Sequence, residues 1–215
     1  MNQNLTEIVA ILDRSGSMEH LTNDTIGGFN SFLKEQKEIP GEAVLTTVLF
    51  NDSYILLHDR ANIKKIKPIT KKEYIAQGST ALLDAMGKTI NDIGSKLNNT
   101  VENERPSKVI FFIITDGEEN ASFEFTNARI KEMVELQKSK YSWEFIFLGA
   151  NIDSFSTASS LGISADRSFD YEADKEGVVS VQMAMSAAVG NLRRFNNVDA
   201  IEGVDYRKKI KKPQK

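Results

Sequence analysis

The segment that most constrains the fold is KVIFFIIT, at residues 108–115. Its unbroken apolar run is typical of a strand that is covered on both faces, because a half-exposed strand alternates apolar and polar residues. Residues 6–12 show a similar pattern. Strands buried on both faces belong to parallel sheets that lie between layers of helices, so the sequence predicts an α/β protein.

Strands and helices alternate along the chain after a hairpin whose short second arm is residues 54–58. This order predicts a doubly wound, mostly parallel central sheet with one antiparallel edge strand and helices on both faces. The expected strands are 6–12, 42–50, 54–58, 108–115, 143–150 and 167–171. The expected helices are 24–38, 126–139, 153–162 and 176–195, with a loop followed by a further helix within 78–97. We expect one domain at 1–196 and a polar, basic tail at 197–215.

Composition excludes several functions. The net charge is −3, so the chain has no overall basic character that would favour nucleic acid. Cysteine is absent, which rules out disulfides, zinc–thiolate sites and a thiol nucleophile. The start of the chain has no signal-peptide pattern, and no segment approaches the roughly 20 apolar residues of a membrane helix. We therefore expect a cytoplasmic protein that does not contact membranes.

Two acids follow the two most apolar strands, Asp13 after 6–12 and Asp116 after 108–115. In open α/β sheets, ligands bind outside the carboxyl ends of the strands, where the strand order reverses. A carboxylate at such a partly desolvated position is costly unless a positive group pairs with it. No Lys or Arg is fixed by sequence beside both acids, and we expect Arg14 to reach out to solvent, so a hard cation would solve the problem.

The residues around Asp13 favour the same interpretation. In Asp13-Arg14-Ser15-Gly16-Ser17, alternate side chains of an extended segment share one side, and Gly16 allows a sharp turn. Asp13, Ser15, Ser17 and Asp116 offer only oxygen ligands, which favour Mg²⁺, Mn²⁺ or Ca²⁺ over Zn²⁺ or Cu²⁺.

Three segments resemble the signatures of von Willebrand factor type A (VWA) domains, in order and separation: DRSGSM at 13–18, GSTALLDA at 78–85 and ITDG at 114–117. The resemblance spans about residues 5 to 195 and is greatest to stand-alone bacterial and phage members. It implies a complete metal-ion-dependent adhesion site (MIDAS). Its ligands would be the hydroxyls of Ser15, Ser17 and Thr80 and the carboxylates of Asp13 and Asp116. It also implies that strands 6–12 and 108–115 are neighbours.

The resemblance further implies a non-enzymatic module in which Mg²⁺, or alternatively Mn²⁺ or Ca²⁺, captures an acidic side chain of a protein partner. A metal-independent scaffold subunit of an ATPase-linked assembly is a second hypothesis. A hydrolase that uses metal-bound water is a third, although no separate general base is evident beside the site. The sequence leaves the oligomeric state open.

Two further sequence features resemble functional motifs but have simpler interpretations. Residues 86–89 (MGKT) resemble the end of a phosphate-binding loop, but position 82 is Leu where that motif needs Gly, and the segment lies in a predicted helix. Glu118 and Glu119 are expected to be solvated loop acids, the alternative being that they tune the metal or repel acidic ligands.

Overall fold

The computed structural model describes residues 1–150, 153–172 and 174–194. Its strands are β1 Asn2–Asp13, β2 Glu42–Phe50, β3 Tyr54–Asn62, β4 Pro106–Thr115, β5 Glu144–Ala150 and β6 Ser168–Tyr171. They form a single sheet in the order β3-β2-β1-β4-β5-β6. The strand β3 pairs antiparallel with β2, and the other neighbours pair in parallel. The predicted fold class is confirmed.

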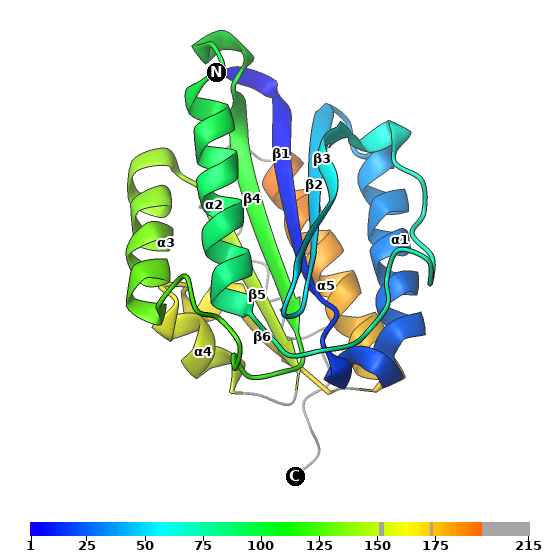
Figure 1. Cartoon of the computed structure of the whole chain (residues 1–215). Helices are drawn as coiled ribbons and strands as arrows, with labels where there is room; N and C mark the ends of the chain where they lie inside the picture. The colour runs from blue at the N-terminus through cyan, green and yellow to red at the C-terminus, as the bar shows by residue number, and fades with distance from the viewer. Residues whose placement is uncertain (151–152, 173, 195–215) are drawn as a thin grey trace.

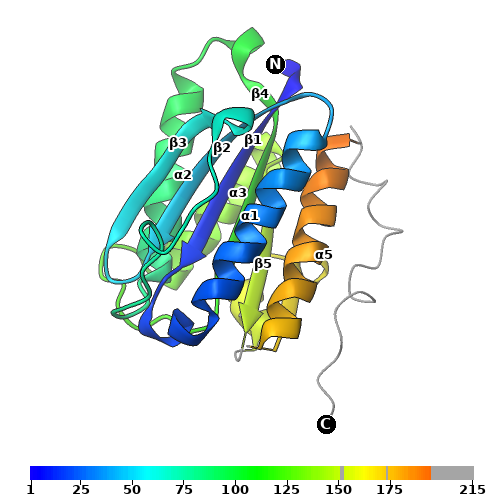
Figure 2. The same cartoon turned by 90° about the vertical axis from the view of Figure 1, so that its right-hand side faces the viewer.

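Helices cover both faces of the sheet, as Figures 1 and 2 show. The α-helices are α1 Thr22–Glu38, α2 Leu82–Asn98, α3 Asn127–Tyr141, α4 Ser154–Ser160 and α5 Lys175–Arg194. Short 3₁₀ helices lie at Gly16–Leu21, Ile63–Lys65, Glu102–Glu104 and Ala165–Arg167. The helices α1 and α5 pack on one face, and α2, α3 and α4 pack on the other.

The alternation of side chains along β4 explains why its sequence is apolar throughout. Phe112 and its even-numbered neighbours belong to the core beneath α1 and α5. Phe111 and its odd-numbered neighbours belong to the core beneath α2, α3 and α4. Because each face of the strand is covered by helices, burial favours an apolar residue at every position.

The strand order reverses between β1 and β4. The chain passes from β1 to β2 on one side, whereas β4 lies on the other side and pairs with β1 up to Leu12 and Ile114. The predicted neighbouring positions of these two strands are therefore confirmed, and their carboxyl ends meet at the switch point of the sheet.

The structure differs from the prediction at several element boundaries. β1 begins at Asn2 rather than at residue 6, and β3 continues to Asn62 rather than ending at residue 58.

The segment 59–77 is polar in composition, but isolated apolar residues within it reach the core: Ile63, Ile66, Ile69 and Tyr74. Phe195 and the tail at 197–215 lie outside the described residues. No helix in the described part of the chain is both long enough and apolar enough to span a bilayer.

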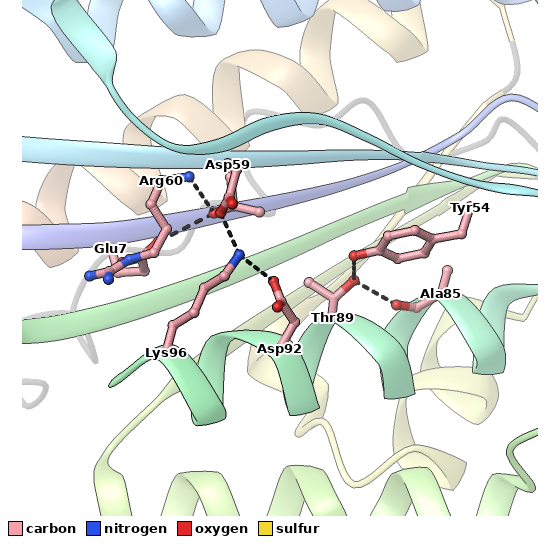
Figure 3. A network of polar contacts seen from close by, with 9 residues as sticks. Glu7, Tyr54, Asp59, Arg60, Ala85, Thr89, Asp92 and Lys96 are labelled. Carbon is pink, nitrogen blue, oxygen red and sulfur yellow. Dashed lines mark hydrogen bonds and ion pairs between the residues drawn. The ribbon is translucent and has the colours of Figure 1, made fainter. Parts of the chain in front are cut away.

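Polar contacts link the antiparallel edge of the sheet to its neighbours (Figure 3). The fully buried Glu7 of β1 forms an ion pair of 2.8 Å with Arg60 of β3 and accepts a hydrogen bond of 3.3 Å from Thr46. Lys96 of α2 forms an ion pair with Asp59, the residue before Arg60. Arg60 has a φ of 45°, and it lies where the pairing register between β2 and β3 shifts.

Candidate metal centre

Asp13 is the last residue of β1, Asp116 directly follows the neighbouring strand β4, and both are almost fully buried. The Oδ1 atom of Asp13 accepts a hydrogen bond of 2.7 Å from the Ser15 backbone N–H. Its Oδ2 atom accepts one of 2.6 Å from the Thr115 hydroxyl. Strand pairing therefore places the two acids, and neighbouring donors fix the orientation of Asp13.

Three hydroxyl oxygens converge beside these acids. The Oγ atoms of Ser15 and Ser17 lie 3.1 Å apart, and the Ser17 hydroxyl donates a 2.6 Å hydrogen bond to Oδ1 of Asp116. A methyl group added at Gly117 would lie 3.1 Å from Thr80 Oγ1, 3.4 Å from Ser17 Oγ and 3.9 Å from Ser15 Oγ. The structure thus brings all five predicted ligand side chains together, while their binding of a metal stays a prediction.

Burial disfavours the charged form of both carboxylates. It raises the pKa of Asp13 to about 6, and the negative charge of Asp116 acts in the same direction, whereas hydrogen bonds from Thr115 and Ser15 oppose the shift. Burial also raises the pKa of Asp116. A cation between the two groups would reverse both effects.

One oxygen of the site lacks a partner. Oδ2 of Asp116 is buried and accepts no hydrogen bond from any described residue. In the described part of the chain, no three His, Cys, Asp or Glu side chains are grouped so that they could hold a metal. The candidate set therefore depends on hydroxyls together with two carboxylates, a composition that suits a hard cation.

Arg14 does not extend into solvent, so that expectation is wrong. Its side chain is only 6% exposed and donates hydrogen bonds of 3.1 Å to Asn51 Oδ1 and 3.2 Å to the Ile75 carbonyl. The Gln77 N–H donates to the Arg14 carbonyl at 2.8 Å. Arg14 thus fastens the segment that leads to Thr80 onto the end of β1.

Asn120 holds Thr80 from the other side. Its Oδ1 accepts a 2.9 Å hydrogen bond from the Thr80 N–H, and its own N–H donates to the Thr80 carbonyl at 3.0 Å. The Ala121 N–H donates to the same carbonyl at 3.2 Å. Thr80 and Asp116 are far apart in sequence, so these contacts with the loop after β4 fix one relative to the other.

Glu119 is not a solvated acid, so that prediction is wrong, whereas Glu118 is exposed as expected. Oε1 of Glu119 accepts hydrogen bonds from the N–H groups of Ala121 at 3.0 Å and Ser122 at 2.7 Å. Its Oε2 accepts from Leu83 N–H at 3.0 Å and from the Ser122 hydroxyl at 2.8 Å. Glu119 therefore joins the loop to the first turn of α2, where a helix favours negative charge.

Asp84 fixes the next part of this loop. Its Oδ2 accepts a 3.1 Å hydrogen bond from Phe123 N–H, and its Oδ1 accepts bonds of 3.0 and 2.9 Å from the N–H groups of Glu124 and Phe125. A methyl group at Gly87 would lie 2.4 Å from the Phe125 ring. The glycine of the MGKT segment lies inside α2, as expected, and makes room for an aromatic ring.

No protein-family model and no curated protein matches this sequence. Solved structures match it with low identity. Proximal thread matrix protein 1 from the mussel byssus shares 15% identity over 89% of this chain and 47% of its own, with a TM-score of 0.59. A von Willebrand factor type A protein from Catenulispora acidiphila shares 14% over 85% and 42%, with a TM-score of 0.57. A form of the mussel protein with a zinc-occupied MIDAS motif shares 16% over 88% and 47%, with a TM-score of 0.55.

At these identities the similarity concerns the fold, a VWA-like arrangement of a six-stranded sheet between helices. The chain spans less than half the length of these two proteins. The zinc-occupied form shows that a structure with this fold holds a divalent metal at a MIDAS motif.

Proposed function

We propose that this chain is a non-enzymatic, VWA-type module that binds a partner protein through a divalent cation. The cation, Mg²⁺ in our proposal, is held by Asp13, Ser15, Ser17, Thr80 and Asp116. The observation that carries the proposal is the buried Oδ2 of Asp116, which no described residue satisfies although three hydroxyl oxygens lie around the adjacent glycine. An acceptor of this kind, next to a second buried acid, suits a cation better than a further donor.

The five candidate ligands also leave a coordination position for a carboxylate of the partner protein. Mg²⁺ prefers six oxygen ligands and commonly keeps several waters, so five side chains divided between direct and water-mediated contacts leave a position for an external ligand. When bound, the cation would supply a positive centre for a carboxylate of the partner. Ser17 is exposed, so the site has an open side.

Thermal unfolding tests the cation site. We expect about 10 mM Mg²⁺ to stabilise the wild type by roughly 2.7 kcal/mol relative to EDTA if the dissociation constant is about 0.1 mM. That stabilisation corresponds to a midpoint shift of about 5–10 °C. Asp116→Ala should abolish the shift, and Glu118→Ala, which removes an exposed acid from the same loop, should keep it. Equal curves with and without metal in the wild type would contradict the proposal.

A peptide-display selection tests the capture of a carboxylate. Peptides with a fixed central Asp should be retained in Mg²⁺ and released by EDTA, whereas the same library with a central Asn should not be retained. Retention that ignores EDTA would favour the metal-independent scaffold hypothesis instead.

A further inference from the structure

Two exposed apolar side chains lie on the loops that contribute to the candidate metal centre. Phe123 is 83% exposed, and Ile75 is 51% exposed. Phe123 belongs to loop 116–126, which begins with Asp116, and Ile75 belongs to segment 66–81, which includes Thr80. Loop 116–126 and the last part of segment 66–81, which leads into α2, lie at the edge of the sheet at which β1 and β4 end (Figure 1).

Hydrogen bonds hold the backbone at Phe123 in place. The N–H groups of Phe123, Glu124 and Phe125 all donate to the carboxylate of Asp84, which is 5% exposed. The ring of Phe125 packs on α2 above Gly87 and against the core. The loop therefore turns one aromatic ring inward and holds the other in water.

Ile75 is held in a similar way on the other loop. Its carbonyl accepts a 3.2 Å hydrogen bond from Arg14. The preceding Tyr74 is 1% exposed, and its hydroxyl donates to the carbonyl of Asp13. These contacts thus hold the segment against residues 13 and 14 at the end of β1, while about half of the Ile75 side chain is exposed.

The charges beside the site restrict the partner. Glu19 and Glu118 are both exposed and flank the Ser17 and Asp116 positions in sequence. These two carboxylates would repel a second acid placed beside them, whereas Lys71 and Lys72 are exposed on the segment that carries Ile75. A segment with one acid among apolar neighbours would meet a cation and two apolar contacts with little repulsion.

We propose that Phe123 and Ile75 form apolar anchors, one on each loop, for a peptide segment of the partner in which apolar residues flank a single acidic side chain. This inference rests on the proposed function, because the acid must reach the cation. Rigidly held aromatic side chains are common energetic centres of interfaces, since little conformational entropy is lost when they bind.

The display selection described above also tests this surface. Peptides that the wild type selects in Mg²⁺ should carry apolar residues beside the central Asp. A selected peptide should bind Phe123→Ala roughly tenfold or more weakly than wild type, and Ile75→Ala should weaken it as well. Leu136→Ala is the matched control, because Leu136 is also 51% exposed but lies on α3, beside a cavity of about 530 Å³ between α2 and α3.

The outcomes separate the two proposals. Selected peptides that show no apolar preference, or that bind Phe123→Ala as tightly as Leu136→Ala, would overturn the anchors while metal-dependent capture stands. Failure to select any Asp peptide in Mg²⁺ would instead overturn the proposed function. Phe123→Ala should keep the full Mg²⁺-induced shift in the unfolding midpoint, so a lost shift would also count against a docking role.

Discussion

Replacing Glu119 by Gln tests how firmly the loop after β4 is attached to α2. The carboxylate accepts four hydrogen bonds, two on each oxygen. An amide retains one oxygen, so it can satisfy Ala121 and Ser122 N–H or the start of α2, but not both. If the amide oxygen keeps the hydrogen bonds from the Ala121 and Ser122 N–H groups, the Leu83 N–H would face the amide N–H₂ group, which cannot accept a hydrogen bond.

The expected cost follows from these contacts. A hydrogen bond to a charged group contributes about 1.5–3 kcal/mol, and a negative charge at a helix N-terminus adds about 0.3–1 kcal/mol. Because Glu119 is only partly buried and the Ser122 hydroxyl can rotate, we expect a loss of about 2 kcal/mol. In a domain of this size, the unfolding midpoint should then fall by about 4–8 °C in EDTA.

The same substitution should weaken Mg²⁺ binding. The loop that Glu119 anchors also carries Asn120, which bonds both backbone groups of Thr80. Groups that orient metal ligands commonly change affinity by at least tenfold, so calorimetric titration should give a dissociation constant about tenfold higher. Glu118→Gln is the control, since it makes the same charge change at the adjacent exposed residue. A midpoint equal to that of Glu118→Gln would refute the stability argument, and unchanged Mg²⁺ affinity would refute the positioning role.

Two further predictions concern the interior. Burial raises the pKa of Glu7 above its ordinary value of 4.5 despite the opposing Arg60 charge, so the folded state holds this proton more tightly than the unfolded state. The contribution of Glu7 to the free energy of unfolding should therefore decline as pH rises above about 4.5. Urea unfolding at several pH values should show this decline in the wild type and its loss in Glu7→Gln. If the free energies of the two proteins changed with pH in parallel, the prediction would be contradicted. Gly87→Ala should cost about 1–3 kcal/mol, because the new methyl group would overlap the Phe125 ring; urea unfolding at wild-type stability would mean that the ring moves away freely.

Much of the fold could be predicted from hydrophobic patterning. The segment 108–115 is apolar on both faces, and the structure covers both faces of β4 with helices. The positions of Asp13 and Asp116 followed from a topological rule, since carboxyl ends of parallel strands meet at one edge. Thr80 required the resemblance, because nothing local to its loop indicates that it reaches these acids.

The residues that hold the candidate site in place were not predictable from local sequence. Arg14, Asp84 and Glu119 are charged residues in or beside loops, a pattern typical of solvated groups. The partners that link segments lie far away in sequence: Arg14 bonds residues 51 and 75, and Glu119, besides its bonds within its own loop, bonds the N-terminus of α2. Only Asp84 had a local signal, as an acid in the first turn of a helix.

The shifted register of β3 has a consequence for association between chains. An edge strand offers free N–H and C=O groups to any other extended chain, and β3 also exposes Ile55 and Leu56. The left-handed backbone at Arg60, fastened by the ion pair to Glu7, interrupts the regular pairing of this strand. Such irregularities bend a strand and hinder its pairing with a strand of another chain. We therefore expect the ion pair between Arg60 and Glu7, which holds this irregularity in place, to reduce edge-to-edge pairing between chains.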